Sequence, residues 1–399
     1  MGKTGTFLMN LKKRFQPVSA LPYPVYLWTV FVLSFAGLAD SIYLAVSHYR
    51  VYTDMGYRSF CAITKSLNCD TVSQSTYAVF LGLPVSIWGI VGYLFILFLI
   101  GFGILVQSDK KRMWPMVFFV SLFYSTYSIV LAIISTFLIQ SYCLMCILAY
   151  AINLLIVYYS WLINNRFGAC SLTTGLREDV RFMIRNRIKA MSAFLPFGVA
   201  LIVLWAFFPN YWTFKPIAIP QNMPTGVTVD GDPWIGSLDP SLTIVEYTDY
   251  RCFQCRKMHF FLRDLIARNP GFIRLVHRHF PMDKAFNPLV KEQVHAGAGR
   301  MALLAIYAAS QDRFWQMNDI LFNLEKDHKQ INMKELARMC ELETKDLARK
   351  LGQPVLVKKL FKNIQEGLAH GINGTPAYVI NGKVYTAQIP PEILKPFLN

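Results

Sequence analysis

Five long apolar stretches dominate the first half of the chain. Each meets or approaches the roughly 20 helical residues needed to cross the hydrocarbon core of a bilayer. The pattern therefore predicts five membrane-spanning helices, at Pro24–Ser47, Pro84–Leu105, Trp114–Leu138, Tyr142–Ile163 and Met191–Phe208. A cleaved signal peptide is the alternative for the first stretch, but it exceeds the apolar core of such signals and lacks a small-residue cleavage site. We therefore expect a retained anchor.

The second half has the pattern of a soluble α/β domain. Residues 209–240 are rich in proline and have no helical period, which predicts a semi-extended linker. Beyond it, Leu242–Tyr247 and Ala377–Ile380 are typical of buried strands, and the second strand should turn at Asn381-Gly382. A helix should begin near Cys252, and helical segments should fill roughly Asn287–Ala369.

Composition and charge favour a membrane protein over a nucleic-acid-binding one. The 399-residue chain is 54% hydrophobic and 16% charged, with a formal charge of +16. Its basic residues gather beside the apolar stretches rather than on one basic face, so we expect no nucleic-acid partner. By the positive-inside rule, three basic segments should be cytoplasmic. They are Lys3, Lys12, Lys13 and Arg14; Lys110, Lys111 and Arg112; and Arg166, Arg177, Arg181, Arg185, Arg187 and Lys189.

The expected fold is multi-domain. An all-α membrane helix bundle, with a four-helix core and a fifth linking span, precedes an α/β domain with a helical insertion. The expected segments are a cytoplasmic N-terminal segment 1–23, a four-span membrane domain 24–163, a basic cytoplasmic loop 164–190, a fifth span 191–208, a periplasmic linker 209–240 and a periplasmic domain 241–399.

Six of the eight cysteines form three close pairs, and this topology places all three pairs on the outer, oxidising side. Cys252 and Cys255 follow a strand and open a helix, where unpaired amides and the helix dipole favour a thiolate at the first sulfur. The second sulfur, one turn later, is placed to resolve a mixed disulfide. Half of a zinc site is the alternative, but His277, His279 and Cys340 lack the spacing of further ligands, so we expect no metal.

The C-terminal segment resembles the thioredoxin-like family, and its DsbA-like branch in particular. The shared features are a strand, C-x-x-C at a helix start, a helical insertion, and Thr375-Pro376 before a strand. The resemblance implies that Pro376 is cis and shapes substrate docking, with Thr375 offering backbone to the bound peptide. It also implies that Glu246 is the buried acid that helps the second cysteine exchange its proton. A paired strand carboxylate is the other interpretation of Glu246.

The dipeptide between the two cysteines departs from strongly oxidising members of that branch. It is Phe253-Gln254 instead of Pro-His, so the histidine that helps stabilise the thiolate is absent and the redox potential is left open. His259 lies four residues past Cys255, and we expect it to be a surface or packing residue.

Two further pairs lie in the membrane half. Cys143 and Cys146 open the fourth span on one helix face, and Cys61 and Cys69 lie in the loop between the first two spans. A disulfide closing so short a loop stabilises by only about 2.5 kcal/mol on the chain-entropy estimate. Because so small a contribution is dispensable in a long chain, electron transfer is the better explanation for this pair.

The membrane half is similar to the vitamin K epoxide reductase family. The similarity rests on the spacing of Cys61 and Cys69, on Ser75, on Gly82-Leu83-Pro84, and on Cys143-x-x-Cys146-x-x-x-Tyr150-Ala151-Ile152-Asn153. With the fused domain it points to the bacterial fusion members. It implies that Cys143 and Cys146 face a quinone, that Cys61 and Cys69 shuttle electrons from the partner domain, and that Tyr150 and Ser75 line or support the quinone site. Structural packing is the alternative for the last two.

Val85 and Asp40 bear on the chemistry expected in the membrane half. Val85 stands where the vertebrate enzymes carry an asparagine that contacts the quinone oxygen, so a plain quinone, ubiquinone or menaquinone, is the expected acceptor. Asp40, inside the first span, is a candidate for proton transfer, with snorkelling to the interface as the favoured alternative. Cys170 and Cys340 have no near partner and should be inert.

Together the two resemblances imply a quinone-dependent enzyme that forms disulfide bonds, in the inner membrane of a bacterium, with its N-terminus cytoplasmic. The three pairs Cys61–Cys69, Cys143–Cys146 and Cys252–Cys255 would be redox-active disulfides. Expected partners are secreted or periplasmic proteins with reduced cysteines, the membrane quinone pool and a separate soluble thioredoxin-like carrier. A quinol-driven reductase with reversed flow is one alternative, and a membrane metal-handling or redox-sensing protein, which bound metal would reveal, is another.

Overall fold

The computed structural model describes residues 21–64, 66–106, 112–168, 171–214, 223–324 and 332–398. Several positions discussed above lie outside these ranges, namely Lys3, Lys12, Lys13, Arg14, Lys110, Lys111 and Cys170. The chain forms two compact units: residues 1–51 with 58–210, and residues 52–57 with 211–399. Each unit is described by itself.

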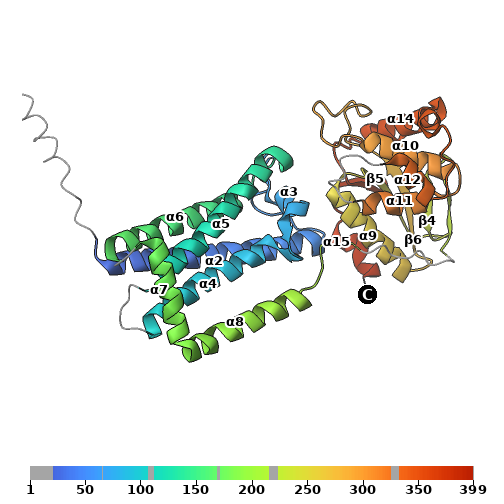
Figure 1. The fold of residues 1–399 in the computed structure, drawn as a ribbon. Coiled ribbons are helices and arrows are strands. Elements are labelled where there is room, and N and C mark those ends of the chain that lie inside the picture. Colours follow the sequence, from blue (N-terminus) through green and yellow to red (C-terminus); the bar gives the residue numbers. More distant parts are fainter. Residues whose placement is uncertain are drawn as a thin grey trace, which may run out of the picture. The chain divides into compact units, whose positions relative to one another are not determined.

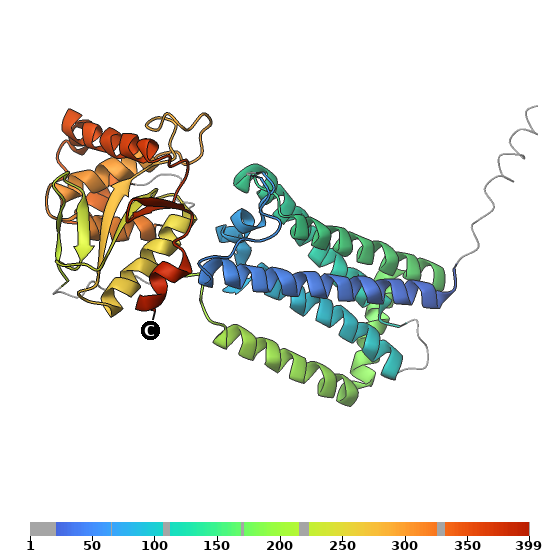
Figure 2. The same cartoon turned by 180° about the vertical axis from the view of Figure 1, so that it is seen from behind.

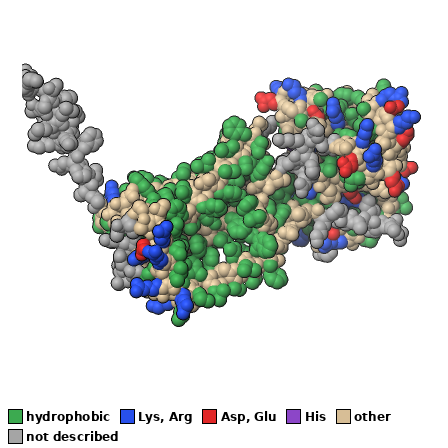
Figure 3. All heavy atoms as spheres, in the orientation of Figure 1, with side chains coloured by type: hydrophobic (Ala, Val, Ile, Leu, Met, Phe, Trp, Pro, Cys, Tyr) green, Lys and Arg blue, Asp and Glu red, His purple; other side chains and the backbone are tan. Residues whose placement is uncertain are grey.

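The first unit is a helix bundle (Figures 1 and 2). Among the described residues, five helices are long and apolar enough to cross a membrane, as the sequence predicts. They are α2 (Tyr23–Thr53), α4 (Val85–Val106), α5 (Trp114–Ile134, continued by the π-turn Ser135–Ile139), α6 (Leu144–Phe167) and α8 (Arg187–Phe207). On the face that Figure 3 shows, hydrophobic side chains cover the bundle, while Lys and Arg gather at the end that carries α7. This is the surface expected of a protein that lies in lipid.

Glycines let three of these helices approach closely. A Cβ at Gly37 of α2 would lie 2.2 Å from the Tyr93 ring of α4, and one at Gly92 of α4 would lie 2.3 Å from the Tyr124 ring of α5. Small residues at helix contacts are the usual route to tight packing in lipid, where no hydrophobic effect drives helices together. Tyr93 and Tyr124 are thereby brought into the interior of the bundle.

The basic loop expected at 164–190 contains a helix that the hydrophobic pattern missed. This helix, α7 (Leu172–Arg185), is capped by Ser171, whose Oγ accepts a hydrogen bond from the amide of Thr174 at 3.4 Å. Its Asp179 is buried and accepts a hydrogen bond from the amide of Met113 at the start of α5, at 3.3 Å. Tertiary packing on α5 therefore stabilises a helix too short and too charged to be recognised as a span.

The second unit is an α/β domain with a six-stranded sheet. The strands are β3 (Thr225–Val227), β4 (Pro233–Gly236), β5 (Leu242–Thr248), β6 (Ile273–His279), β7 (Ala377–Ile380) and β8 (Lys383–Thr386), in the order β3-β4-β6-β5-β7-β8. β5 and β6 are parallel, and the other neighbours are antiparallel. The helices are α9 (Phe253–Arg268), α10 (Ala298–Ala309), α11 (Phe314–Asn323), α12 (Met333–Met339), α13 (Leu347–Leu351), α14 (Pro354–Ala369) and α15 (Pro391–Leu394).

Local sequence signals set several of these boundaries. Asn381 and Gly382 both have positive φ, 50° and 77°, which is the geometry that Asn-Gly favours in a two-residue hairpin, so the predicted turn is confirmed. Pro354 occupies the first turn of α14, where its missing amide costs no hydrogen bond. The multi-domain fold class expected from the sequence is likewise confirmed.

The prediction that residues 209–240 form only a linker was wrong in part. β3 and β4 lie inside this range and belong to the sheet, so the folded domain begins before residue 241. β4 pairs with β6, with Ile235 opposite Leu275, and Ile235 is fully buried. The pairing partner lies about 40 residues away, so no local pattern announces these short strands.

Candidate functional site

The membrane unit brings its four paired cysteines into one cluster. Cys61 and Cys69 are joined by a disulfide. Cys143 caps the N-terminus of α6, and its sulfur accepts a hydrogen bond from the amide of Cys146 at 3.1 Å. Cys61, Cys69 and Cys143 are buried and pack together, with Cys146 against them. Two pairs that are far apart in the sequence thus pack against one another.

Backbone pairing fixes this arrangement. Leu67 forms a parallel bridge with Tyr142, directly before the two cysteines Cys69 and Cys143. The amide of Asn68 donates to the carbonyl of Tyr142 at 2.9 Å, and the amide of Tyr142 donates to the carbonyl of Ser66 at 2.7 Å. Because main-chain hydrogen bonds sit one or two residues from each cysteine, the loop holds its disulfide against the start of α6.

Beside this cluster lies a cavity of about 140 Å³. It is mainly apolar, and Cys69, Cys143 and Cys146 are all in its wall. Ser75 and Tyr150, the residues singled out from the sequence, also line it. The hydroxyl of Ser75 donates to the carbonyl of Val72 at 2.7 Å and so anchors the end of helix α3 (Cys69–Ser73). A pocket with apolar walls, a few polar groups and a reactive pair is the usual form of a small-molecule site.

A hydrogen-bonded chain in the cavity wall was missed by the sequence reasoning. The Tyr93 hydroxyl donates to Asn153 Oδ1 at 2.8 Å, and Asn153 Nδ2 donates to the hydroxyl of Ser128 at 2.9 Å. Asn153 belongs to the quoted motif and follows Tyr150 by three residues, one helical turn, which was the available signal. Val85 also lines the cavity, so an apolar side chain occupies that part of the wall.

Asp40 does not snorkel to the interface, so the favoured interpretation of this residue was wrong. Its side chain is only 3% exposed, and neither carboxylate oxygen has a hydrogen-bond partner among the described residues. It lies within electrostatic range of Tyr93, Cys143 and Cys146. Its neighbour Ser41 lines the cavity. The bundle fold turns Asp40 inward, because the close packing of α2 and α4 determines which face of α2 is buried.

In the second unit, Cys252 and Cys255 open α9. Cys252 is the N-cap, and its sulfur accepts a hydrogen bond from the amide of Cys255 at 3.4 Å. The Thr375-Pro376 bond is cis. The carbonyl of Thr375 accepts a hydrogen bond from the Cys252 thiol at 3.4 Å. The residues expected to dock substrate therefore lie next to the redox pair.

The two thiols differ in acidity. The hydrogen bond from the Cys255 thiol lowers the pKa of Cys252 to about 7 against the effect of burial, and His295 adds to the lowering. Burial raises the pKa of Cys255 well above its ordinary value, and its contact with Cys252 adds to this. Cys252 is thus the nucleophile, while Cys255 retains its proton until the exchange reaction. Cys340 is buried, and burial raises the pKa of its thiol to about 11.

Glu246 is buried in β5 and pairs with His277, which the sequence analysis set aside because it lacks the spacing of a zinc ligand. Its Oε1 lies 2.8 Å from Nδ1 of His277 on β6, the residue opposite it in the parallel register. Burial raises the pKa of Glu246 to about 7 and lowers that of His277 to about 3. His259 is also buried, with Nε2 2.9 Å from Asp319 Oδ1. The alternation of His277 and His279 along one strand was the available signal.

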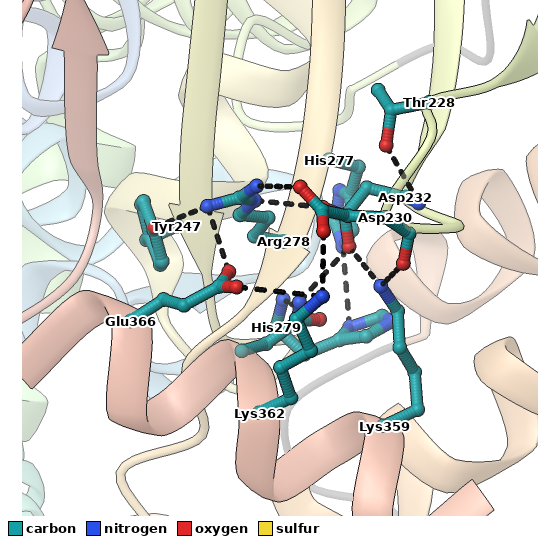
Figure 4. Close-up of polar contacts among 11 residues, drawn as sticks. Thr228, Asp230, Asp232, Tyr247, His277, Arg278, His279, Lys359, Lys362 and Glu366 are labelled. Atoms are coloured by element: carbon teal, nitrogen blue, oxygen red, sulfur yellow. Dashed lines mark hydrogen bonds and ion pairs between the residues drawn. The ribbon is translucent and has the colours of Figure 1, made fainter.

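A charged cluster ties β6 and α14 to the loop before β4 (Figure 4). The buried carboxylate of Asp232 accepts hydrogen bonds from Arg278 Nε at 2.8 Å, from Asn363 Nδ2 at 2.9 Å and from Lys359. Burial alone would raise the pKa of Asp232, but these contacts outweigh it and hold the pKa below its ordinary value. In the part of the chain that the structure describes, no group of three or more His, Cys, Asp or Glu side chains could hold a metal ion.

These sites define a class of protein. A nucleophilic cysteine at a helix N-terminus with a resolving thiol, and two further cysteine pairs in a membrane helix bundle, form the machinery of a membrane-bound thiol-disulfide oxidoreductase. Comparison with known proteins agrees. The model of the vitamin K epoxide reductase family matches residues 28–161, and a thioredoxin model matches residues 228–399. The chain is therefore a vitamin K epoxide reductase family domain joined to a thioredoxin-like domain.

Individual curated proteins share only low sequence identity with this chain. The Na(+)/H(+) antiporter NhaA 1 of Mycolicibacterium gilvum (strain PYR-GCK) is 26% identical over 209 residues, 52% of this chain and 32% of the antiporter. The antiporter NhaA of Herminiimonas arsenicoxydans is 24% identical over 223 residues, 56% of this chain and 32% of that protein. The chain thus spans about a third of the length of these curated relatives.

Solved structures resemble part of the chain. A thioredoxin-like oxidoreductase from Silicibacter pomeroyi DSS-3 shares 21% identity over 43% of this chain and 91% of its own, with a TM-score of 0.35. The alpha-DsbA1 protein of Wolbachia pipientis shares 18% identity over 41% of this chain and 80% of its own, with a TM-score of 0.32.

Proposed function

We propose that this protein forms disulfide bonds in secreted or periplasmic proteins and passes the electrons to a membrane quinone. The overall reaction takes two electrons and two protons from a substrate dithiol, which becomes a disulfide, and gives them to the quinone, which becomes a quinol. The observation that carries the proposal is the clustering of Cys61, Cys69, Cys143 and Cys146 at the wall of an apolar cavity inside a membrane helix bundle.

The first exchange takes place on the thioredoxin-like domain. A substrate thiolate attacks the sulfur of Cys252 in the oxidised pair, and Cys255 leaves and is protonated. A second substrate thiolate then displaces Cys252, which releases the oxidised substrate. The low pKa of Cys252 makes it a good leaving group, and the carbonyl of Thr375 beside it supports the role of Thr375 and Pro376 in docking extended substrate. A separate soluble thioredoxin-like carrier is a further partner at this step.

The later exchanges take place in the membrane domain. Cys61 and Cys69 receive electrons from the Cys252–Cys255 dithiol and pass them to Cys143 and Cys146. Their packing against Cys143 supports this order, since a thiolate must reach the sulfur it attacks. Fusing the two domains raises their effective concentration, so reoxidation of Cys252–Cys255 does not depend on a bimolecular encounter.

The cavity residues fit a quinone. The walls are mainly apolar, aromatic rings of Tyr77, Trp88, Tyr124, Tyr127 and Tyr150 line them, and Asn153 and Ser128 contribute polar groups. Such a group accepts two electrons and two protons when bound. In this proposal Tyr150 and Ser75 orient it, and the buried carboxyl of Asp40 takes up thiol protons. Asp40→Asn should slow quinone reduction, and equal rates in variant and wild type would exclude this role.

Orientation follows from the positive-inside rule, with the N-terminus and α7 in the cytoplasm and the three cysteine pairs and the C-terminal domain in the periplasm of a bacterium. The N-terminal and inter-helix basic segments and the arginines of α7 support it. Labelling cysteines introduced into α7 and into the C-terminal domain of intact cells with a membrane-impermeant maleimide tests the orientation. Labelling of α7 alone would show that the orientation is the opposite of the proposed one.

The function is tested with the detergent-purified chain, a reduced unfolded substrate and a short-chain ubiquinone or menaquinone analogue. Wild type should reduce the quinone, and Cys146→Ala and Cys252→Ala should not. Cys340→Ala removes a buried thiol outside all three pairs and should match wild type. If Cys252→Ala keeps full activity, the fused domain is not the entry point for electrons. If wild type reduces no quinone, the proposed acceptor is wrong.

A further inference from the structure

The burial of Glu246 separates its carboxyl group from solvent. A carboxyl that exchanges a proton with Cys255 must itself be recharged, yet its side chain is only 1% exposed. Direct exchange with solvent is therefore blocked. The contacts of Glu246 show where its proton can go.

One neighbour of Glu246 is also close to the redox pair. Tyr378 is its neighbour in the pairing of β5 with β7, and it lies within electrostatic range of Glu246, Cys252 and Cys255. The hydroxyl of Tyr378 is buried and has no hydrogen-bond partner among the described residues. It is therefore available to bridge the carboxyl and the Cys255 thiol.

Glu246 also lies next to two histidines in line. Glu246 Oε1 lies 2.8 Å from His277 Nδ1, and His277 Nε2 lies 3.2 Å from His279 Nδ1. The hydroxyl of Thr248 also approaches His277 Nε2, at 3.4 Å. All three members of the row Glu246, His277 and His279 are buried. Figure 4 shows His277 and His279 next to the cluster of Asp232 and Lys359, and Lys359 is partly exposed.

We propose that His277 and His279 form a proton relay that connects the buried Glu246 to the partly exposed Asp232–Lys359 cluster. When Glu246 is ionised, His277 donates from Nδ1 to the carboxylate and accepts at Nε2. When Glu246 is protonated, the carboxyl donates to Nδ1 and His277 donates from Nε2. Each change of state moves one proton through His277 by a change of tautomer, and no buried imidazolium forms.

The electrostatics of the surroundings agree with neutral relay histidines. Burial lowers the pKa of His277 to about 3 and that of His279 well below its ordinary value, so both stay neutral at physiological pH. The titratable and charged groups that face Glu246 and the two histidines come from α9, β7, the loop after β5 and the Asp232 cluster. They are His259, Arg263, Tyr378, Tyr250, Asp232 and Lys359.

The relay rests on the thiol-disulfide exchange of Cys252 and Cys255 and needs no quinone. During reduction, a dithiol thiolate attacks Cys252, a new S–S bond forms as the Cys252–Cys255 bond breaks, and Cys255 leaves as a thiolate. It takes a proton from Glu246, and Glu246 regains one from His277, which is resupplied through His279. Without the relay, only the fraction of Glu246 that already carries a proton can serve.

The test uses the full-length protein in detergent with every cysteine except Cys252 and Cys255 replaced by serine. Reduction by dithiothreitol is followed in stopped flow in H₂O and D₂O, with rates corrected for the dithiothreitol thiolate concentration. In wild type the corrected rate should stay nearly flat above about pH 7. In His277→Gln, which keeps an amide beside Glu246 but cannot change tautomer, it should fall about tenfold per pH unit there, and the solvent isotope effect should shrink.

Tyr250→Phe is the matched control. The Tyr250 ring stacks on His277 at 5.9 Å, and its hydroxyl donates to Asn318 at 2.8 Å, outside the relay. It should keep the wild-type profile, and a fall equal to that of His277→Gln would assign the effect to packing and overturn the proposal. A wild-type profile in His277→Gln would also overturn it. If His277→Gln does not fold, His279→Gln interrupts the contact between the two histidines instead. Its corrected rate should then fall above about pH 7, and a wild-type profile would overturn the proposal.

Discussion

The acidity of Cys252 yields the sharpest prediction, because the Cys255 thiol is its largest cause. A pKa of about 7 for Cys252, against about 8.5 for an ordinary thiol, corresponds to about 2 kcal/mol of preference for the thiolate. At neutral pH about half of Cys252 is then ionised, compared with about 3% of an ordinary thiol. Cys255→Ala removes the thiol hydrogen bond but keeps the backbone amide and His295. We expect the pKa of Cys252 to rise by about one unit.

The assay is the rate of iodoacetamide alkylation at Cys252 between about pH 5 and about pH 9, located by peptide mass spectrometry. The full chain is used in its reduced form, with the membrane cysteines and Cys170 replaced by serine. Below the midpoint, the variant should react about tenfold more slowly than wild type. Cys340→Ala, which removes a buried thiol elsewhere in the domain, should leave the midpoint unchanged. An unchanged midpoint in Cys255→Ala would refute the thiol hydrogen bond as the main cause, as would faster alkylation of Cys255 than of Cys252 in wild type.

Three further predictions concern buried polar groups. Burial raises the pKa of Glu246 to about 7, above its unfolded value of about 4.3. The contribution of Glu246 to the free energy of unfolding is therefore full below about pH 4 and is lost as the pH rises through 7. Glu246→Gln should therefore match wild type near pH 4 and be about 3–4 kcal/mol more stable near pH 8, measured by urea-dependent proteolysis of the C-terminal domain; equal stability at both pH values would contradict this. Asp232→Ala leaves Arg278 and Lys359 without their buried partner and should cost about 3 kcal/mol or more in the same assay, while Asp230→Ala at the exposed edge of the cluster should cause no measurable loss. Asn153→Leu removes the 2.8 Å partner of the Tyr93 hydroxyl, which keeps only a 3.5 Å contact with the carbonyl of Ala149, and should lower the melting temperature in detergent by an amount equivalent to about 1–3 kcal/mol; an unchanged melting temperature would contradict this.

The sequence by itself determined the features that depend on local pattern. Span length and hydropathy predicted five membrane helices, and Asn381-Gly382 predicted the hairpin, because helix length and turn geometry are fixed by neighbouring residues. The short spacing within each cysteine pair singled out the six candidate redox sulfurs for the same reason. Motifs then recovered both domain families.

Only the tertiary structure decided how distant segments meet. It placed β4 in the sheet, turned Asp40 into the bundle, and brought the disulfide of Cys61 and Cys69 against Cys143. It also set the parallel register of β5 and β6, which puts Glu246 opposite His277, 31 residues away. A shift of one residue in that register would turn the histidines to the other face of the sheet. Register and helix facing depend on packing summed over the whole core, so no short stretch of sequence contains them.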